Sequence, residues 1–179
     1  AVGRNYPGVA SITEIWDGTS WTEVNDGAIG YGASYAGTVN AGFQAGQRNG
    51  SGGILAGTKE WNGTNWSAGG DMITARANQA AMLGTQNAAK HMGGFGGSPA
   101  VKSTCVEDYN GTSFATAQGL PIGTELFSGG GTQNAGISTG GQTDAENPTA
   151  KTHEWNGISF NQTANLVNGR KTNDIADGS

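Results

Sequence analysis

The chain alternates short apolar stretches with breaks rich in Gly, Asn and Thr, and it lacks an apolar stripe of useful length at helical spacing. Residues 78–124 show this pattern most clearly. We predict strands there at about 78–83, 88–95, 103–109 and 112–116, because turn-forming residues bound each of these segments. The pattern therefore predicts an all-β protein made of short antiparallel strands.

A seven-residue motif recurs four times, with two aromatic residues five positions apart around an Asx-Gly pair. A second motif, Gly-Thr-x-Asn-Ala, begins at residues 37, 84 and 131, which are 47 residues apart. The aromatic motif advances by 45, 48 and 46 residues, so two independent signals share one period. Its aromatic residues, predicted to be structural, are Trp16, Trp21, Trp61, Trp66, Tyr109, Phe114, Trp155 and Phe160.

A period of 40–50 residues is typical of a four-stranded propeller blade or of a helical pair. The 33 glycines among 179 residues and the repeated Asx-Gly turns favour the β unit. We expect one propeller domain over residues 1–179, with repeats at about 1–36, 37–83, 84–130 and 131–179. About four four-stranded blades would form either a complete small ring or part of a larger propeller.

The Asn62-Gly63 pair predicts a two-residue type I′ turn, in which both central residues take positive φ. Trp61 would then face Thr64, and Trp61 and Trp66 would be diagonal neighbours on one face of the hairpin. A three-residue turn with a bulge would shift this pairing. Either hairpin gives an aromatic face that a single unit cannot bury, so we expect it to pack against the next unit.

The Gly-Gly pair followed by two spaced aromatic residues resembles the kelch repeat. Gly96-Gly97 with Tyr109 and Phe114, and Gly140-Gly141 with Trp155 and Phe160, carry this pattern. The first unit departs from it, with only Gly3 before Trp16, and the second has its Gly-Gly pair close to Trp61. The tandem motifs are similar to those of kelch-like repeat proteins of marine bacteriophages, including phages of cyanobacteria. This resemblance covers essentially the whole chain and implies a kelch-like β-propeller.

The charge distribution argues against several functions. A net charge of −5 and a pI near 4.8 disfavour a nucleic-acid surface, which needs a basic stripe. Cys105 is the only cysteine, and His91 and His153 occupy non-equivalent strand positions, where we expect partly exposed side chains. No apolar run approaches membrane-spanning length. We therefore expect no catalytic residue, metal ligand, cofactor, nucleic-acid partner or membrane insertion.

An acidic residue precedes or nearly precedes each first aromatic residue, and Arg76 and Arg170 each lie ten positions after a second aromatic residue. The acidic residues are Glu14, Glu60, Asp108 and Glu154. A calcium site would need several oxygens clustered together. The repeated spacing instead favours structural pairing between an acidic residue and an arginine.

The connection between the second and third strands differs in every unit, and variable loops on a rigid frame often carry recognition. The candidate ligand-binding residues in and around these loops are Arg4, Tyr6, Arg48, Lys102, Asp144 and Glu146. We expect a non-enzymatic structural or adhesion module of a phage particle, virion-associated or extracellular. Its partners would be other virion proteins or a host-surface glycan, and a homo-oligomer is compatible with the repeats. The alternative is a lectin-like carbohydrate-binding propeller.

Overall fold

The computed structural model describes residues 2–4, 11–27, 30–78, 80–97, 99, 101–144 and 147–171. These residues form strands, turns and loops, with no helix among them, so the predicted all-β class is confirmed. The part of the chain described here accordingly holds no helix long and apolar enough to cross a membrane.

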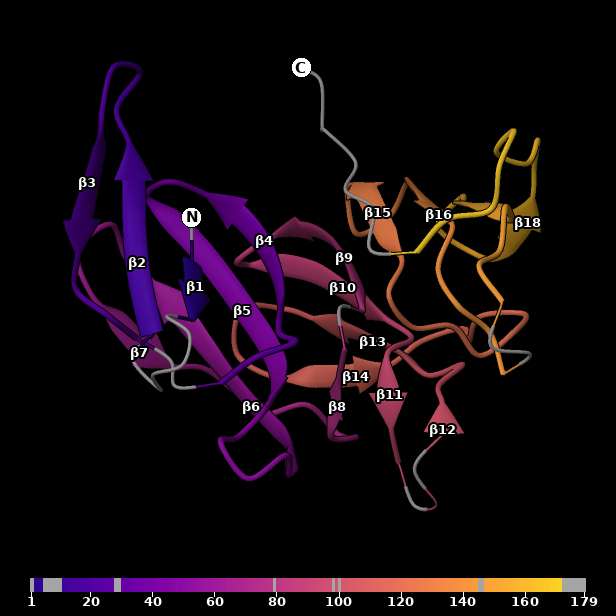
Figure 1. Ribbon diagram of the computed structural model, residues 1–179, viewed down its shortest axis with the longest axis horizontal. Helices are drawn as coiled ribbons and strands as arrows, with labels where there is room; N and C mark the ends of the chain where they lie inside the picture. Colours follow the sequence, from indigo (N-terminus) through magenta and orange to yellow (C-terminus); the bar gives the residue numbers. More distant parts are fainter. Residues whose placement is uncertain are drawn as a thin grey trace.

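The strands form five antiparallel sheets, in which the larger sheets run as meanders in chain order (Figure 1). The first sheet contains β1 (Val2–Arg4), β2 (Ser11–Trp16) and β3 (Trp21–Val24). The second contains β4 (Ser34–Thr38), β5 (Ala41–Arg48), β6 (Ile54–Trp61) and β7 (Trp66–Ala68). The third contains β9 (Ala81–Thr85), β10 (Ala88–Met92), β13 (Val106–Tyr109) and β14 (Phe114–Thr116). The fourth contains β15 (Ser128–Gly131), β16 (Gly136–Thr139), β17 (Thr152–Trp155) and β18 (Phe160–Gln162), and a small sheet contains β8 (Arg76–Ala77), β11 (Phe95–Gly96) and β12 (Val101–Lys102).

Glycines interrupt the long second strand that we predicted over residues 88–95. Gly93 and Gly94 have φ values of 65° and 89° and separate β10 from β11. A Cβ on Gly93 would lie 2.5 Å from the carbonyl oxygen of Thr124, so the close approach of this connection requires glycine. The small sheet is thus a continuation of the third sheet beyond this break.

The repeated hairpin differs from the predicted type I′ turn. Trp61 pairs directly with Trp66, so the loop between them has four residues and the rings are directly opposite rather than diagonal. Asn62 accepts hydrogen bonds at Oδ1 from the amides two and three residues later, at 3.0 and 2.8 Å, and only Gly63 has positive φ. The Asx side chain therefore organises the turn, and a two-residue turn is not needed. The same two amide bonds occur at Asp17, Asn110 and Asn156.

Neighbouring sheets pack through equivalent strands. The ring of Phe43 on β5 stacks on Tyr109 of the third sheet, with 4.5 Å between centroids and 14° between planes. At the next interface Lys90 takes the place of Phe43, and its Nζ lies 4.1 Å from the centroid of the Trp155 ring. Both contacts join the second strand of one sheet to the third strand of the following sheet.

A glutamine in the Gly-Thr-Gln-Asn-Ala turn also joins one sheet to the preceding one. Gln133 Nε2 donates to the carbonyl oxygens of Ala89 and Tyr109, at 2.9 and 2.8 Å. Gln86 repeats this arrangement toward the second sheet. The first and fourth sheets lie at opposite sides of the molecule, with the other sheets between them (Figure 1).

Candidate functional site

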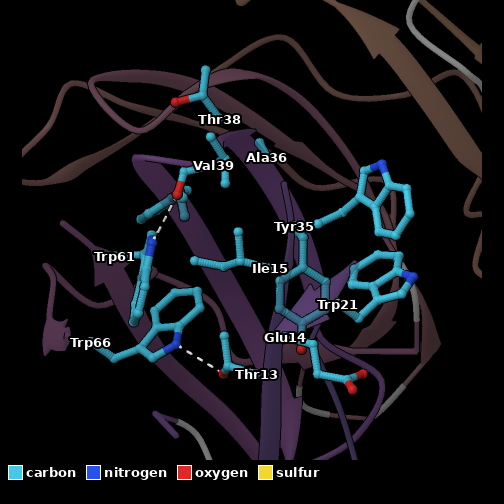
Figure 2. Close-up of a pocket in the computed structure, with 13 residues that line it drawn as sticks. Thr13, Glu14, Ile15, Trp21, Tyr35, Ala36, Thr38, Val39, Trp61 and Trp66 are labelled. Carbon is cyan, nitrogen blue, oxygen red and sulfur yellow. Dashed lines mark hydrogen bonds between the residues drawn. The ribbon is translucent and has the colours of Figure 1, made fainter. Parts of the chain in front are cut away.

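An aromatic groove of about 500 Å³ lies between the first and second sheets. Figure 2 shows Trp61 and Trp66 on one side of the groove, Tyr35 and Trp21 on the other, and Ile15 between them. The full lining is Thr13, Glu14, Ile15, Trp16, Trp21, Tyr35, Ala36, Thr38, Val39, Gly42, Phe43, Trp61 and Trp66. Glu14 is the single formally charged residue in this lining, so the surface is dominated by rings.

The wall formed by the second sheet holds its indole groups in fixed positions. Trp61 Nε1 donates to the carbonyl oxygen of Val39 at 2.9 Å, and Trp66 Nε1 donates to Thr13 Oγ1 at 3.2 Å (Figure 2). The two ring centroids are 5.5 Å apart. Because both N–H groups are bonded within the protein, these residues offer a ligand ring surface rather than a hydrogen-bond donor.

The corresponding aromatic pair of the first sheet is exposed. Trp16 and Trp21 retain 48% and 56% of their accessible surface, whereas Trp61, Tyr109 and Trp155 at the same repeat position as Trp16 are buried. Phe43 and Lys90 of the preceding sheets cover Tyr109 and Trp155, and no described strand packs in that way on the first pair. The first aromatic residue of the motif is therefore buried in three units and exposed in one.

The groove lies beside the first sheet, which has three strands among the described residues, whereas the second, third and fourth sheets have four. Within the described residues, β1 pairs with β2 only through Ser11–Thr13, so Glu14–Trp16 have a strand neighbour on the β3 side alone. The matching residues of the third sheet, Glu107–Tyr109, pair with β10. The groove therefore lies beside the part of β2 that has no partner strand on the β1 side.

Tyr35 supplies a polar group to this apolar groove. Burial raises the pKa of Tyr35 to about 12, although 43% of the residue's surface stays accessible. The hydroxyl is therefore a neutral donor and acceptor at neutral and mildly alkaline pH.

The predicted recognition residues are not gathered in this groove. Arg48 is held by Asn78 Oδ1 at 2.9 Å and by the carbonyl oxygen of Gly52 at 3.0 Å, with its guanidinium 5.3 Å from the centroid of the Phe95 ring. These contacts tie Arg48 to the small sheet and its neighbours. Arg4 lies on β1, but its side chain, like Tyr6 and Glu146, is outside the described residues.

Two further predicted residues are close to each other but differ in exposure. Lys102 is buried, and its Nζ donates to the carbonyl oxygen of Thr143 at 2.9 Å and lies 3.8 Å from Glu125 Oε1. Asp144 follows Thr143 and is exposed. Lys102 therefore anchors the loop that carries Asp144 rather than projecting from the surface.

A buried ion pair forms the polar centre of the third sheet. Arg76 Nη2 lies 2.9 Å from Glu107 Oε1, and both side chains are fully buried. Glu107 also accepts hydrogen bonds from the amides of Ile73 and Thr74, at 2.8 and 3.1 Å. Arg76 Nη1 donates to two backbone carbonyl oxygens. This network fixes the connection between β7 and β8.

Arg76 pairs with an acidic residue, as we predicted, but with a different one. We expected an arginine to pair with the acidic residue beside the first aromatic residue, which is Asp108 in this unit. Asp108 instead accepts from Lys90 Nζ at 2.6 Å, and Arg76 pairs with Glu107. Successive strand residues point to opposite faces, so a shift of one position sends the carboxylate to the other side of the sheet.

Both histidines are buried, which contradicts the expectation of partly exposed side chains. They lie on central strands of the third and fourth sheets, where neighbouring sheets cover them. Burial, followed by the charge of Arg76, lowers the pKa of His91 well below its ordinary value, and Nδ1 has no hydrogen-bond partner among the described residues. Burial and Lys151 lower the pKa of His153 in the same direction.

We predict that acid destabilises the protein through His91. In the unfolded chain His91 binds a proton near pH 6.5, whereas the buried side chain in the folded protein does not. The free energy of unfolding is therefore highest above that pH and falls below it by up to about 1.4 kcal/mol per pH unit. His91→Leu should remove this component of the pH dependence, as measured by urea unfolding at neutral and acidic pH. His153→Leu should remove a smaller component, because the pKa of His153 is lowered less than that of His91. An unchanged pH profile in His91→Leu would contradict the assignment.

Within the described ranges, no group of three or more His, Cys, Asp or Glu side chains is placed to hold a metal ion. No protein-family model matches the chain, and no curated protein matches its sequence significantly.

Sequence reasoning missed the centre of the groove. Ile15 is the first residue of its copy of the seven-residue motif, where the later copies have an acidic residue, and this difference was the available signal. Tyr35 belongs to no repeated motif, so its type and spacing carry no signal. Only the packing of the sheets shows that Tyr35 faces the groove.

Proposed function

We propose that the chain is a kelch-like β-propeller segment that serves as a non-enzymatic structural or adhesion module of a phage particle, such as part of a tail fibre or surface appendage. Its four larger sheets are the blades of this segment. Three of them are four-stranded meanders, and β4, β9 and β15 lie next to one another as the innermost strands. The repeated contacts of Phe43 with Tyr109 and of Lys90 with Trp155 support a blade-to-blade interface.

The aromatic groove is the observation that carries the binding role. Exposed tryptophan and tyrosine side chains are enriched at protein interfaces, because they combine a large apolar surface with a polar group. Trp16, Trp21 and Tyr35 form such a surface beside buried copies of the same motif. The phage assignment rests on the resemblance of the tandem motifs, and the partner class is another virion protein or the host surface.

The assignment is tested in purified particles. Mass spectrometry and a specific antibody should detect the protein in the particle, and mild dissociation should release it together with a neighbouring structural protein. Trp66→Ala should weaken that contact, whereas Val167→Ala, at an exposed residue outside the groove, should leave it unchanged. Absence of the protein from purified particles would rule out the structural assignment.

A lectin-like role is the second candidate, and the composition of the groove favours it. Sugars present C–H groups that pack on aromatic rings and hydroxyl groups that hydrogen bond to polar side chains. The groove offers both features, with the rings of Trp61 and Trp66 opposite the Tyr35 hydroxyl and Glu14 at its edge. Its volume of about 500 Å³ is within the range of small-molecule sites.

We predict that glycan binding by this groove depends on Tyr35. Tyr35→Ala should weaken binding to a responding glycan by roughly tenfold or more, because it removes a ring and a hydrogen-bonding group from a partly desolvated site. A glycan array followed by calorimetry measures this effect, with Val167→Ala as the control. Binding should stay constant at mildly alkaline pH, since the pKa of Tyr35 is about 12. An array without any response would exclude the lectin.

A further inference from the structure

Three of the repeated hairpins place an asparagine directly before a glycine, at Asn62-Gly63, Asn110-Gly111 and Asn156-Gly157. All three asparagines are exposed. This dipeptide is chemically reactive, because the glycine nitrogen can attack the side-chain amide carbon of the preceding asparagine. Glycine favours the attack because it has no Cβ to obstruct the approach. The fold decides whether each amide is held over that nitrogen or away from it.

The side-chain amide of each hairpin asparagine is folded back toward the glycine nitrogen. Asn110 Oδ1 accepts hydrogen bonds from the amides of Thr112 and Ser113, both at 3.0 Å. The bond from the amide two residues later closes a ring that includes the nitrogen between them, so it draws Cγ of Asn110 toward Gly111 N. The same pair of bonds, between 2.8 and 3.0 Å, holds Asn62 and Asn156.

The groups that this attack needs are not engaged elsewhere. In the part of the chain that the structure describes, the glycine nitrogens of the three hairpins donate no hydrogen bond, and neither do the Nδ2 groups of the asparagines before them. The two amides on Oδ1 lie where negative charge develops in the tetrahedral intermediate, and backbone N–H groups at such distances stabilise an oxyanion. The turn therefore supplies both position and charge stabilisation.

The first hairpin shows that the product of this reaction fits the turn. Asp17 takes the place of the asparagine there, and its Oδ1 accepts from the amides of Thr19 and Ser20 at 2.8 Å each. The hydrogen bonds from Ser20 and Thr19 lower the pKa of Asp17 below its ordinary value. A carboxylate is a stronger acceptor than an amide oxygen, so an aspartate in the other hairpins keeps the same two bonds.

We propose that Asn62, Asn110 and Asn156 are self-modifying sites, at which the folded hairpin promotes the conversion of asparagine to aspartate. Base from the solvent removes the proton of the glycine nitrogen, which then bonds to Cγ. The bond between Cγ and Nδ2 breaks, Nδ2 takes up a proton from water and leaves as ammonia, and a cyclic imide remains. Water opens the imide at Cγ to give aspartate, or at the main-chain carbonyl to give isoaspartate. Each conversion adds a negative charge at an exposed turn, and nothing is oxidised or reduced.

Peptide mapping by mass spectrometry tests this proposal. The intact protein is incubated in mildly alkaline buffer, either folded or unfolded in urea, and the loss of each asparagine is followed with time. The hairpin asparagines should convert at least about threefold faster in the folded chain, because only the folded turn presents both amides to Oδ1. Aspartate and isoaspartate both count as conversion. Conversion that is equal or slower in the folded protein overturns the proposal.

Asn168-Gly169 provides an internal control in the same samples. It is the same dipeptide in an exposed part of the chain, but within the described ranges no hydrogen bond holds the Asn168 side chain. Its rate should therefore agree between the folded and the unfolded chain to within about twofold, because nothing positions its amide. An acceleration at Asn168 as large as that at the hairpins would show that the turn is not the cause, which also overturns the proposal.

A substitution tests whether the hairpin accepts the product. Asn110→Asp should melt at the wild-type temperature or above it, because the carboxylate keeps both amide bonds. Asn110→Ala is the matched comparison and should melt at a lower temperature, since the amides of Thr112 and Ser113 then lose their acceptor. An aspartate variant as unstable as the alanine variant would contradict the assignment. These outcomes do not depend on what the protein binds, so a failure here leaves the proposed function standing.

Discussion

Glu107→Ala is expected to lower the free energy of unfolding by about 3–5 kcal/mol, which is the usual effect of removing one member of a buried ion pair. The substitution leaves the Arg76 guanidinium buried without its carboxylate. It also leaves the amides of Ile73 and Thr74 without the acceptors that they use at 2.8 and 3.1 Å. Urea unfolding followed by tryptophan fluorescence measures the loss.

Two further variants show whether the loss comes from the stranded charge. Glu23→Ala, on the exposed strand β3, should change stability by less than about 0.5 kcal/mol. The double variant Arg76→Met with Glu107→Leu should recover much of the loss, because it removes both charges together. A double variant no more stable than Glu107→Ala would mean that the amide contacts, and not the charge, dominate.

Phe43→Ala is expected to cost about 3–5 kcal/mol of unfolding free energy, as do other truncations of buried phenylalanines. Phe43 is fully buried and stacks on Tyr109, so its removal opens a cavity between the second and third sheets. The loss should appear in both chemical and thermal unfolding. It should also make the two sheets unfold less cooperatively, because this contact joins them.

Ile137→Ala is the matched control, because Ile137 holds the same repeat position in the fourth sheet. It is only partly buried, so the substitution should cost less than about 2 kcal/mol. Equal losses in the two variants would contradict the view that burial of this position comes from the following sheet.

The sequence predicted much of the fold because the repeat encodes it locally. The Asx-Gly motif marks a hairpin in each of the four units, the Gly-Thr-x-Asn-Ala motif marks one in three of them, and the strands fall close to the expected positions. The turn type was wrong, since Asn62 binds the two amides through its side chain and removes the need for positive φ at that residue. The gap between β10 and β11 was also missed, because Gly93 is required by contact with a distant carbonyl group.

The ionic centre and the groove depend on contacts between units, which spacing alone does not specify. Arg76 pairs with Glu107 and not with Asp108 because the two carboxylates lie on opposite faces of β13. Only the face of Glu107 meets the connection between β7 and β8. His91 is buried because a second sheet covers a strand that would otherwise be half exposed. Neither result follows from the residue type, since adjacent positions in one strand have opposite surroundings.

The sequence by itself determined the β class, the period and the hairpins, because each depends on residues close together in the chain. The tertiary structure alone decided what each copy of the motif does. Trp61 and Trp66 form one wall of a groove, and Tyr109 joins two sheets, while Trp16 and Trp21 remain exposed. Identical motifs have different roles because burial is set by the neighbouring sheet, and the first sheet has no described neighbour on that face.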